Sequence, residues 1–528
     1  MNNKVQVILQ ARTGSKRLYG KSLLPITNEP LVVLCNRRLK NKDLKIITLI
    51  PTGKEDNYLA YVLKKNKLKF FRGHKLNVLK RFRTYTKKLK EDDIVIRVTA
   101  DNPFVDGVFL KKLLNIYKSK KLEYFSAHDN IKNLPYGIQA EIFKVKHLRE
   151  TTLKNKYNSE HVTPEIKKKY LDKNIKIFLR NYSGISNLKL SIDTLNDLNR
   201  VKKIFFYFRG NSYSNLSKIV RTKNLEKKIS KNKISKILLG TVQIGKKYFQ
   251  KKFQISQARA NNIIKAALKE KINFFDTAHD YGKSEKFIGN FRSRNKNNVF
   301  ICSKLKNLNL NKRNEKKEII NKINFSIFES LNRLKCAQLE NFLVHNSADL
   351  FNSKILYNHL KKFTSSGIIK NLGVSIYNPL ELKKLNKYKE IKCVQLPFNL
   401  IDHRWIKFLN KANNNLKIFI RSIFLRGNLT KNEIKFPKKT KKTVKVNDVL
   451  RKLCMEFKKK DFYELTLAYL KSFEGISNLI IGAQTPNHIK EFKNVSKVKK
   501  LNAKQKEKLI RVIKSNINIH QLDLRNWN

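Results

Sequence analysis

The chain has 528 residues, too many for one typical hydrophobic core, so two or three domains are expected. Lysine and arginine total 115 against 40 acidic residues, a formal net charge of +75. This charge would suit nucleic-acid or membrane-surface binding, but the cations spread along the whole chain without an RNA-binding aromatic signature or zinc-finger spacing. No apolar run approaches the roughly 20 residues of a membrane span, and the five cysteines form no CxxC pair. Composition therefore argues against a nucleic-acid-binding, membrane-spanning or disulfide-stabilised protein.

The first predicted element is an apolar strand at Val5–Leu9, followed at once by a loop rich in glycine and cations. Because glycine lets backbone amides approach a phosphate and cations neutralise its charge, this loop is predicted to bind phosphate groups. Its candidate ligands are Arg12, Gly14, Ser15, Arg17 and Lys21. The spacing of a P-loop is absent, and a plain basic surface loop is the alternative. The start is too lightly charged for a signal peptide, so a cytoplasmic location is expected.

Further polar motifs follow in chain order. They are FRG with NVLKRF (Arg72, Arg81), DIVIRVTADNP (Asp101), PYGIQAEIF (Glu141), SEHVTP (Glu160, His161) and LSIDTLNDL (Asp193, Asp197). Together with VQVILQARTGSKRLYGKSLLPI, this series resembles the cytidylyltransferases that activate acidic sugars, in particular the spore-coat polysaccharide branch. The resemblance covers about residues 3–210, and the proline usual in the loop is Tyr19 here.

This resemblance implies an open nucleotide-binding α/β sheet with its site at the carboxyl ends of the strands. Arg72 and Arg81 would join the loop in holding the nucleotide. Asp101 and Asp193 would bind Mg²⁺, for which carboxylates at strand ends are natural ligands. A sugar hydroxyl would attack the α-phosphate of CTP and release pyrophosphate. Asp197 lies at a predicted helix start, where aspartate is favoured anyway, so a structural role is preferred for it.

A lysine- and asparagine-rich stretch around residues 219–236 has no convincing helical pattern. It predicts a linker at 219–235, between a nucleotidyltransferase-like domain at 1–218 and a second domain at 236–528. A second polar stretch near residues 431–446 is predicted to be a loop at the mouth of an active site.

Eight apolar, β-rich runs alternate with helical patterns in the second domain. They are KILLGTV, INFFDTA, VFICSKL, NFLVHN, IKNLGVSI, CVQLPFN, LKIFIRSIF and NLIIGA. One helical pattern between them is QARANNIIKAALKE, whose apolar Ala260, Ile263, Ile264 and Ala267 share a face. Strand–helix alternation repeated eight times predicts a (β/α)₈ TIM barrel.

Four polar residues at or just past the ends of these runs form a candidate proton-transfer set: Asp276, Tyr281, Lys304 and His345. A tyrosine can protonate a carbonyl oxygen as hydride reaches the carbon, but an unperturbed phenol, with a pKa of about 10, is a poor acid. A lysine lowers that pKa, an aspartate holds the lysine, and a histidine orients the carbonyl or relays the proton. Each residue alone also has a structural explanation, but their spacing across successive strand ends favours catalysis.

The surrounding motifs GTVQIG, FDTAHDYGKSE, CSK, LVHN, GVSIYN, VQLPFN and IIGAQTPNHIKEF resemble the aldo-keto reductases over roughly residues 234–500. The resemblance implies that Tyr281 is the general acid, that Lys304 and Asp276 tune it, and that His345 binds the substrate oxygen. It also implies contacts to a nicotinamide cofactor from Ser375, Gln395, Ser422, Gly482, Thr485 and His488.

Some positions depart from the pattern of this family. Ile376 replaces an asparagine that often follows the serine, and Arg421 stands where an aromatic ring commonly stacks on the nicotinamide; Phe424 could substitute for it. Gly482 and His488 stand where many members place a lysine and an arginine on the adenosine 2′-phosphate. NADP is therefore expected from family habit, and NAD stays open.

These features predict a bifunctional enzyme of sugar or surface-polysaccharide metabolism. Its first domain would transfer CMP to a sugar or sugar acid, and its barrel would carry out NAD(P)-linked oxidoreduction of a carbonyl or alcohol. One alternative is a barrel that binds its cofactor without catalysis, as a scaffold or sensor; another is a basic protein that binds RNA or anionic lipid. Homo-oligomerisation stays open.

Overall fold

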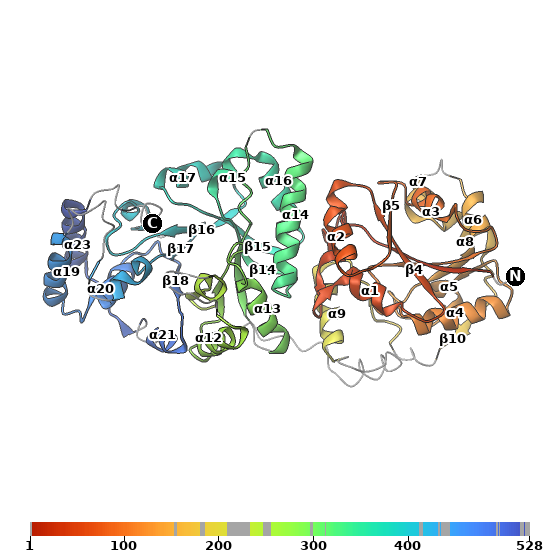
Figure 1. The fold of residues 1–528 in the computed structure, drawn as a ribbon, viewed down its shortest axis with the longest axis horizontal. Coiled ribbons are helices and arrows are strands. Elements are labelled where there is room, and N and C mark those ends of the chain that lie inside the picture. The colour runs from red at the N-terminus through yellow and green to blue at the C-terminus, as the bar shows by residue number, and fades with distance from the viewer. Residues whose placement is uncertain are drawn as a thin grey trace. The chain divides into compact units, whose positions relative to one another are not determined.

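The computed structural model describes residues 3–152, 156–179, 185–207, 233–246, 255–295, 299–311, 313–410, 415–430, 433–434, 444–492, 495, 497–517 and 522 (Figure 1). The chain forms two compact units: residues 1–230 with 314–337 and 365–368, and residues 231–313, 338–364 and 369–528. The predicted linker at 219–235 falls largely outside the described residues and stays a prediction, as do the exact domain limits. Across the described ranges, no helix is both long and apolar enough to cross a membrane.

The amino-terminal unit is built on a six-stranded sheet in the order β5-β4-β1-β6-β9-β7. The strands are β1 (Val5–Gln10), β4 (Lys45–Pro51), β5 (Phe70–Gly73), β6 (Ile94–Thr99), β7 (Tyr124–Ser126) and β9 (Glu141–Lys144). The first four run parallel, and β9 pairs antiparallel with both β6 and β7. The predicted open, mostly parallel α/β sheet is confirmed. Because β1 and β6 are neighbours, the loops that follow them meet at one edge.

Helices cover this sheet. They are α1 (Leu31–Arg38), α2 (Asn57–Lys65), α3 (Val78–Thr86), α4 (Gly107–Ser119), α5 (Ala127–Asn130), α6 (Val145–Glu150), α7 (Lys156–His161), α8 (Pro164–Tyr170) and α9 (Leu195–Tyr207). Two short strand pairs, β2 (Pro25–Ile26) with β3 (Glu29–Pro30) and β8 (Ile131–Lys132) with β10 (Ile177–Phe178), lie outside the main sheet. Buried side chains of α3, α6 and α8 pack on the sheet with Ile8, Leu49 and Phe143 and form its core.

The second unit contains a closed barrel of eight parallel strands. They are β11 (Ile237–Gly240), β12 (Phe274–Asp276), β13 (Phe300–Lys304), β14 (Leu339–Val344), β15 (Ile369–Ser375), β16 (Ile391–Pro397), β17 (Lys417–Arg421) and β18 (Asn478–Gly482). Each strand falls within, or overlaps, one of the eight apolar runs, so the predicted TIM barrel is confirmed. One buried side chain from most strands fills the interior, including Phe274, Cys302 and Phe419.

Helices separate the strands along the chain. They are α11 (Val242–Gly245), α12 (Gln257–Lys269), α13 (Ser284–Arg294), α14 (Lys316–Arg333), α15 (Ser347–Asn352), α16 (Lys354–Ser365), α17 (Pro379–Lys384), α18 (Ile406–Leu409), α19 (Val444–Glu456), α20 (Phe462–Leu470), α21 (Pro486–Glu491) and α23 (Ala503–Asn516). The apolar face predicted for α12 is buried as expected, and the Ser256 side chain caps its amino terminus. Most of the polar stretch near 431–446 lies outside the described residues, and α19 already begins at Val444.

Candidate active sites of the two domains

The barrel site is centred on a buried ion pair between the last residues of two neighbouring strands. Lys304 ends β13 and Asp276 ends β12, and Nζ of Lys304 donates to Oδ1 and Oδ2 of Asp276 at 2.7 and 2.8 Å. Nζ also donates to the carbonyl of Thr277 at 3.0 Å, so all three ammonium protons have acceptors. Lys304 is fully buried and Asp276 is 4% exposed. Burial alone would lower the pKa of Lys304, but the Asp276 carboxylate outweighs it and raises that pKa.

Tyr281 reaches this pair from the turn that follows β12. Its ring centroid lies 4.9 Å from Nζ of Lys304. Burial raises the pKa of the phenol, whereas the Lys304 and Arg421 cations lower it by a smaller amount. The lysine thus acts in the predicted direction, but the net pKa of Tyr281 without ligand is raised, because desolvation is the larger effect.

His345 follows β14 and completes the predicted set. Its ring meets the Tyr281 ring edge-on, with centroids 5.9 Å apart. Nδ1 of His345 lies 3.7 Å from Oδ2 of Asp280, and burial lowers the pKa of the imidazole. Asp280 is itself anchored by the backbone N–H of Asn307 at 2.9 Å. The structure therefore brings all four predicted residues together and adds Asp280, a carboxylate behind the histidine.

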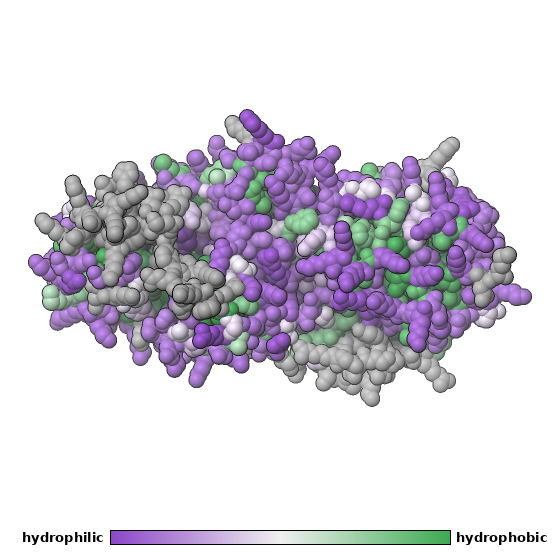
Figure 2. Space-filling model, viewed as in Figure 1, coloured by the Kyte–Doolittle hydropathy of each residue, from purple (hydrophilic) through white to green (hydrophobic). Residues whose placement is uncertain are grey.

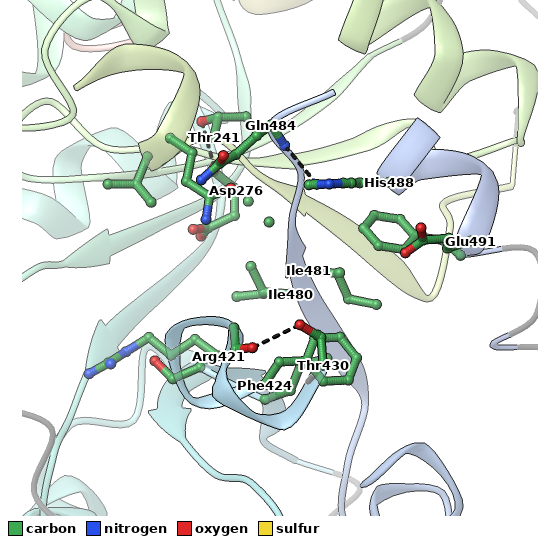
Figure 3. Close-up of a pocket in the computed structure, with 18 of the residues that line it drawn as sticks. Thr241, Asp276, Arg421, Phe424, Thr430, Ile480, Ile481, Gln484, His488 and Glu491 are labelled. Atoms are coloured by element: carbon green, nitrogen blue, oxygen red, sulfur yellow. Dashed lines mark hydrogen bonds between the residues drawn. The ribbon is translucent and has the colours of Figure 1, made fainter. Parts of the chain in front are cut away.

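A cavity of about 880 Å³ opens beside this set (Figure 3). Asp276 and Tyr281 line it together with three predicted cofactor residues, Ser422, Gly482 and His488. Figure 3 shows Ile480 and Ile481 between Arg421 and Phe424 on one side and Gln484 and His488 on the other. A volume of this size is typical of small-molecule and cofactor sites.

The other predicted cofactor residues lie outside the lining. Thr485 caps α21, where its hydroxyl accepts the backbone N–H of His488 at 3.4 Å. Ser375 and Gln395 are buried near the ends of β15 and β16. Nε2 of Gln395 donates to Oδ1 of Asp276 at 2.8 Å, which ties it to the ion pair.

Unsatisfied polar atoms test whether this cavity fits a nicotinamide dinucleotide. Oε1 of Gln395 and Oε1 of Gln243, a residue of the cavity wall, are buried, and no described residue donates a hydrogen bond to them. Buried acceptors of this kind normally have a donor. An amide group and ribose hydroxyls would supply such donors, so the residues present fit the cofactor.

The two departures in the barrel sequence have visible consequences. The Arg421 guanidinium stacks on Tyr377, with Cζ 4.2 Å from the ring centroid. Phe424 stacks on Tyr463 at a centroid distance of 4.7 Å, and both rings line the cavity. The aromatic surface of the cavity is therefore formed by Phe424 with Tyr463, and Arg421 contributes a cation.

In the amino-terminal unit, Lys21 gathers the two predicted metal ligands. Its Nζ donates to Oδ2 of Asp101 at 2.7 Å, to Oδ1 of Asp193 at 3.3 Å and to the carbonyl of Ile192 at 2.8 Å. Nη2 of Arg17 donates to the same Oδ1 of Asp193 at 3.0 Å. Burial would raise the pKa of Asp101, but the Lys21 ammonium and the Thr99 hydroxyl outweigh it and hold that pKa below its usual range.

The loop after β1 presents its polar groups as predicted. Arg12, Gly14 and Arg17 are exposed and Ser15 is half-buried. A Cβ built on Gly14 would meet no atom within 4 Å, so open space faces its backbone. The loop is anchored underneath by Thr13, whose buried N–H donates to Asp56 at 2.8 Å. These features leave room for a phosphate chain above the loop.

Arg72 and Arg81 are held by backbone carbonyls instead of by the Lys21 group. Arg72 donates to the carbonyls of Pro51 and Gly53 at 3.3 and 2.9 Å. Arg81 is 1% exposed and donates to the carbonyl of His74 at 3.1 and 2.9 Å. Burial lowers the pKa of Arg81 to about 10, against the attraction of Asp56. Both side chains brace the loops beside the site, and direct contact with a nucleotide stays a prediction.

Asp101 and Asp193, which Lys21 brings together, fit a Mg²⁺ site. This ion commonly binds through one or two protein carboxylates together with substrate phosphates. Within the described ranges, no group of three or more His, Cys, Asp or Glu side chains could hold a metal, so the phosphates would have to complete its shell.

Asp197 has the structural role preferred for it. It exchanges hydrogen bonds with Thr194 at the start of α9: the Thr194 hydroxyl accepts the N–H of Asp197 at 3.2 Å, and Oδ2 of Asp197 accepts the N–H of Thr194 at 2.9 Å. Asp197 also accepts from Lys189 at 3.0 Å and Arg200 at 2.6 Å, and from the N–H of Asp193 at 3.1 Å. Lys189 additionally pairs with Asp193 at 3.3 Å.

Sequence reasoning missed Lys189, Arg200, Asp280 and Tyr377. Only Asp280 carried a signal, because it directly precedes Tyr281 in FDTAHDYGKSE. The others become neighbours of site residues only once the loops are folded.

Comparison with known proteins identifies both halves. The aldo/keto reductase family matches residues 236–514, just over half of the chain, and the cytidylyltransferase family matches residues 6–238. The chain belongs to both families. The aldo/keto reductase domain and the cytidylyltransferase domain together support a bifunctional enzyme, an oxidoreductase fused to a nucleotidyltransferase.

Two curated relatives match the cytidylyltransferase domain. The uncharacterized protein MJ1063 of Methanocaldococcus jannaschii is 33% identical over 202 residues, which cover 37% of this chain and 80% of that protein. The spore coat polysaccharide biosynthesis protein SpsF of Bacillus subtilis is 30% identical over 227 residues, 38% of this chain and 87% of that protein. Among solved structures, the holo form of the aldo-keto reductase AKR11C1 from Bacillus halodurans is 18% identical, with a TM-score of 0.44; the match covers 55% of this chain and 95% of that one.

Proposed function

We propose that the chain transfers CMP from CTP to a sugar or sugar acid and reduces a carbonyl, or oxidises the corresponding alcohol, with NAD(P) as redox partner. The observation that carries the proposal is the buried Lys304–Asp276 pair, with Tyr281 and His345 beside it at the strand ends of an aldo/keto reductase barrel. A scaffold without catalysis would gain nothing from a fully buried ion pair, which costs several kcal/mol of desolvation per ion.

In the barrel, Gln395 and the cavity wall would hold the reduced dinucleotide, which when bound would supply hydride to the carbonyl carbon. Tyr281 would deliver its proton to the carbonyl oxygen, because Lys304 stabilises the phenolate left behind. His345 would donate to or orient the same oxygen, and Asp276 keeps Lys304 charged and fixed. In the reverse direction, the same groups would accept the proton of an alcohol.

In the amino-terminal domain, Arg17 and Lys21 would neutralise the triphosphate, and Asp101 and Asp193 would hold Mg²⁺. The metal, when bound, would add charge neutralisation at the phosphates. A sugar oxygen would bond to the α-phosphorus as the bond to pyrophosphate breaks. Lys21, held by both carboxylates, is the cation best placed to stabilise the charge that develops.

The name of the Bacillus subtilis relative supports a place in polysaccharide biosynthesis. Fusion of the two enzymes favours substrates from one sugar pathway. NADP is expected from the habit of the family. The cavity wall, however, has Gly482 and His488 where many members have a lysine and an arginine that bind the 2′-phosphate of NADP, so both dinucleotides should be compared.

The test combines ligand binding with turnover on the full chain. Melting temperature is measured with CTP, UTP, GTP and ATP plus Mg²⁺, then with NADPH and NADH. Pyrophosphate release from CTP is measured with a panel of sugars and sugar acids, and dinucleotide oxidation with a panel of carbonyls.

Two variants serve as controls for each other. Tyr281→Phe should lower reductase kcat/KM by about 10²- to 10⁴-fold, the usual worth of a general acid, and leave pyrophosphate release intact. Asp101→Asn should lower pyrophosphate release and leave reductase kcat/KM intact. If a dinucleotide raises the melting temperature but no carbonyl is reduced, the barrel is a scaffold or sensor; the cation at the usual stacking position is the feature that favours this second candidate. If Tyr281→Phe reduces carbonyls as fast as wild type, a group other than Tyr281 supplies the proton.

A further inference from the structure

Arg421 is a cation at the mouth of the barrel that the mechanism above does not use. It is the last residue of β17 and lines the cavity with Asp276 and Tyr281. Its guanidinium lies over the ring of Tyr377, with Cζ 4.2 Å from the centroid, which fixes the guanidinium plane. Figure 3 shows the side chain extending away from Phe424 and Thr430.

One nitrogen of this guanidinium has no acceptor among the residues that the structure describes. Nη2 of Arg421 is buried and donates to none of them. A buried donor without an acceptor costs about 1–3 kcal/mol, more when the group is charged. Lys304, the other buried cation of the site, is neutralised by Asp276, whereas the described residues give Arg421 no ion-pair partner. The guanidinium of Arg421 therefore has a donor available for an added anion, in a cavity that Glu433 and Glu491 also line.

This charge acts on the reacting groups. The Arg421 cation lowers the pKa of Tyr281 and of His345, although burial is the larger influence on each. Because Arg421, Asp276 and Tyr281 line one cavity, a substrate whose carbonyl meets Tyr281 can direct an acidic substituent toward Arg421. Asp280 also faces His345, but its charge is engaged by that ring, by His279 and by the Asn307 N–H.

We propose that Arg421 binds a carboxylate carried by the barrel's substrate and so makes the reductase selective for acidic carbonyl compounds. The inference rests on the proposed reductase function and names its substrate class. A planar guanidinium matches a planar carboxylate with two parallel hydrogen bonds. A monoanion is favoured over a phosphate dianion, because the one guanidinium balances one negative charge, and the Asp280, Glu433 and Glu491 carboxylates would repel a second.

The test uses two matched probes on the full chain, 4-carboxybenzaldehyde and its neutral methyl ester. The measured quantity is the ratio of kcat/KM for the acid to kcat/KM for the ester. Arg421→Gln should lower this ratio by about 10- to 100-fold, the range for loss of a charge-assisted contact. Arg421→Lys should recover part of it. Arg511→Gln, which removes an exposed charge on α23, should leave the ratio unchanged.

Equilibrium binding separates this inference from the proposed function. The affinities of 4-(hydroxymethyl)benzoate and of the dinucleotide are measured by calorimetry for wild type and Arg421→Gln. A tenfold or greater loss for the benzoate alone supports the inference, even if neither aldehyde turns over, a result that would count against the reductase function only. Failure of wild type to bind the benzoate overturns the inference. So does a loss confined to the dinucleotide, since Arg421 would then be a cofactor contact.

Discussion

At the scale of single residues, Lys304 keeps its charge inside the barrel because Asp276 faces it. Replacing it as Lys304→Met would leave the carboxylate buried and unpaired, and breaking a buried pair in this way costs about 3–5 kcal/mol. Both tryptophans, Trp405 and Trp527, lie in the carboxy-terminal half, so urea unfolding followed by tryptophan fluorescence reports the barrel. The urea concentration at the midpoint of unfolding should fall by this free energy divided by the slope of unfolding free energy against urea concentration.

The pH dependence of this contribution has a definite sign. Because the folded pKa of Lys304 is raised, the contribution of Lys304 to stability is complete below its unfolded pKa of about 10.4 and is lost as pH rises through the folded pKa.

The control for Lys304→Met is the double variant Lys304→Met with Asp276→Leu. A double variant that regains no stability would show that lost packing, and not the unpaired carboxylate, explains the effect.

Tyr281 gives a second residue-scale prediction, on the pH dependence of turnover. In the proposed mechanism the phenol donates a proton during reduction and must therefore be protonated, and burial raises its pKa above the ordinary value of about 10. The rate of reduction should therefore stay flat from neutral pH to about pH 9 and fall only at higher pH. An initial-rate profile measures this. A fall in rate centred near pH 7 would assign the proton to a different group, and His345, whose pKa burial lowers, would be the first to test.

At the scale of elements, the turn that carries Tyr281 packs against the end of α11 without a gap. A Cβ on Gly245 would overlap the carbonyl oxygen of Tyr281 and lie 2.6 Å from the N–H nitrogen of Ser284. Gly245→Ala should therefore displace the turn, and a shift of about 1 Å at a catalytic group can cost about 10²-fold in rate. Reductase kcat measures the effect. Gly14→Ala, where the added carbon meets open space, is the matched control and should leave reductase kcat unchanged.

The start of α9 yields a prediction for the other domain. Asp197→Ala removes the reciprocal bonds to Thr194 and should cost about 1 kcal/mol of stability. It also frees the N–H of Asp193 and the Lys189 side chain, so pyrophosphate release from CTP should fall as well. Burial raises the pKa of Asp197, but the hydrogen bonds from Lys189, Arg200 and Thr194 outweigh burial and lower that pKa. The stabilisation by Asp197 is therefore complete above its unfolded pKa of about 3.9 and is lost as pH falls through the lower folded pKa.

The matched control for this substitution lies on α23. Asn502 and Gln505 exchange the same kind of hydrogen bonds at the start of that helix. Asn502→Ala should cost a similar stability and leave pyrophosphate release unchanged. Equal losses of release in both variants would mean that Asp197 acts through stability alone.

Elements were predictable where periodicity is strong. The buried face of α12 and the eight barrel strands follow from the spacing of apolar residues, because that spacing determines which side chains can be buried together. The positions of Asp276 and Lys304 followed too, because parallel neighbours bring their ends to one edge. The stacking of Arg421 on Tyr377 and the bond from Lys189 to Asp197 join side chains on separate segments, and no periodic pattern in the sequence encodes them.

At the scale of the whole molecule, neither site accounts for most of the net charge of +75. Hydrophilic residues cover most of the face in Figure 2, in keeping with cations distributed over the surface. Charges of this kind act over a screening length of about 8 Å at physiological salt. They would raise the encounter rate of the triphosphate, the dinucleotide and an acidic substrate with their sites.

Salt dependence distinguishes this steering from a dedicated RNA or lipid function. Contacts spread over many phosphates weaken steeply, so affinity for a single-stranded RNA probe should fall by about 10³-fold or more between 50 and 200 mM salt. The affinity for CTP and for the dinucleotide, each of which we expect to contact only a few charged groups, should change by less than about tenfold. Filter binding and calorimetry on the same preparation measure the two slopes. Tight RNA binding that survives physiological salt and discriminates between sequences would place the main function on the surface, because steering alone produces no such selectivity.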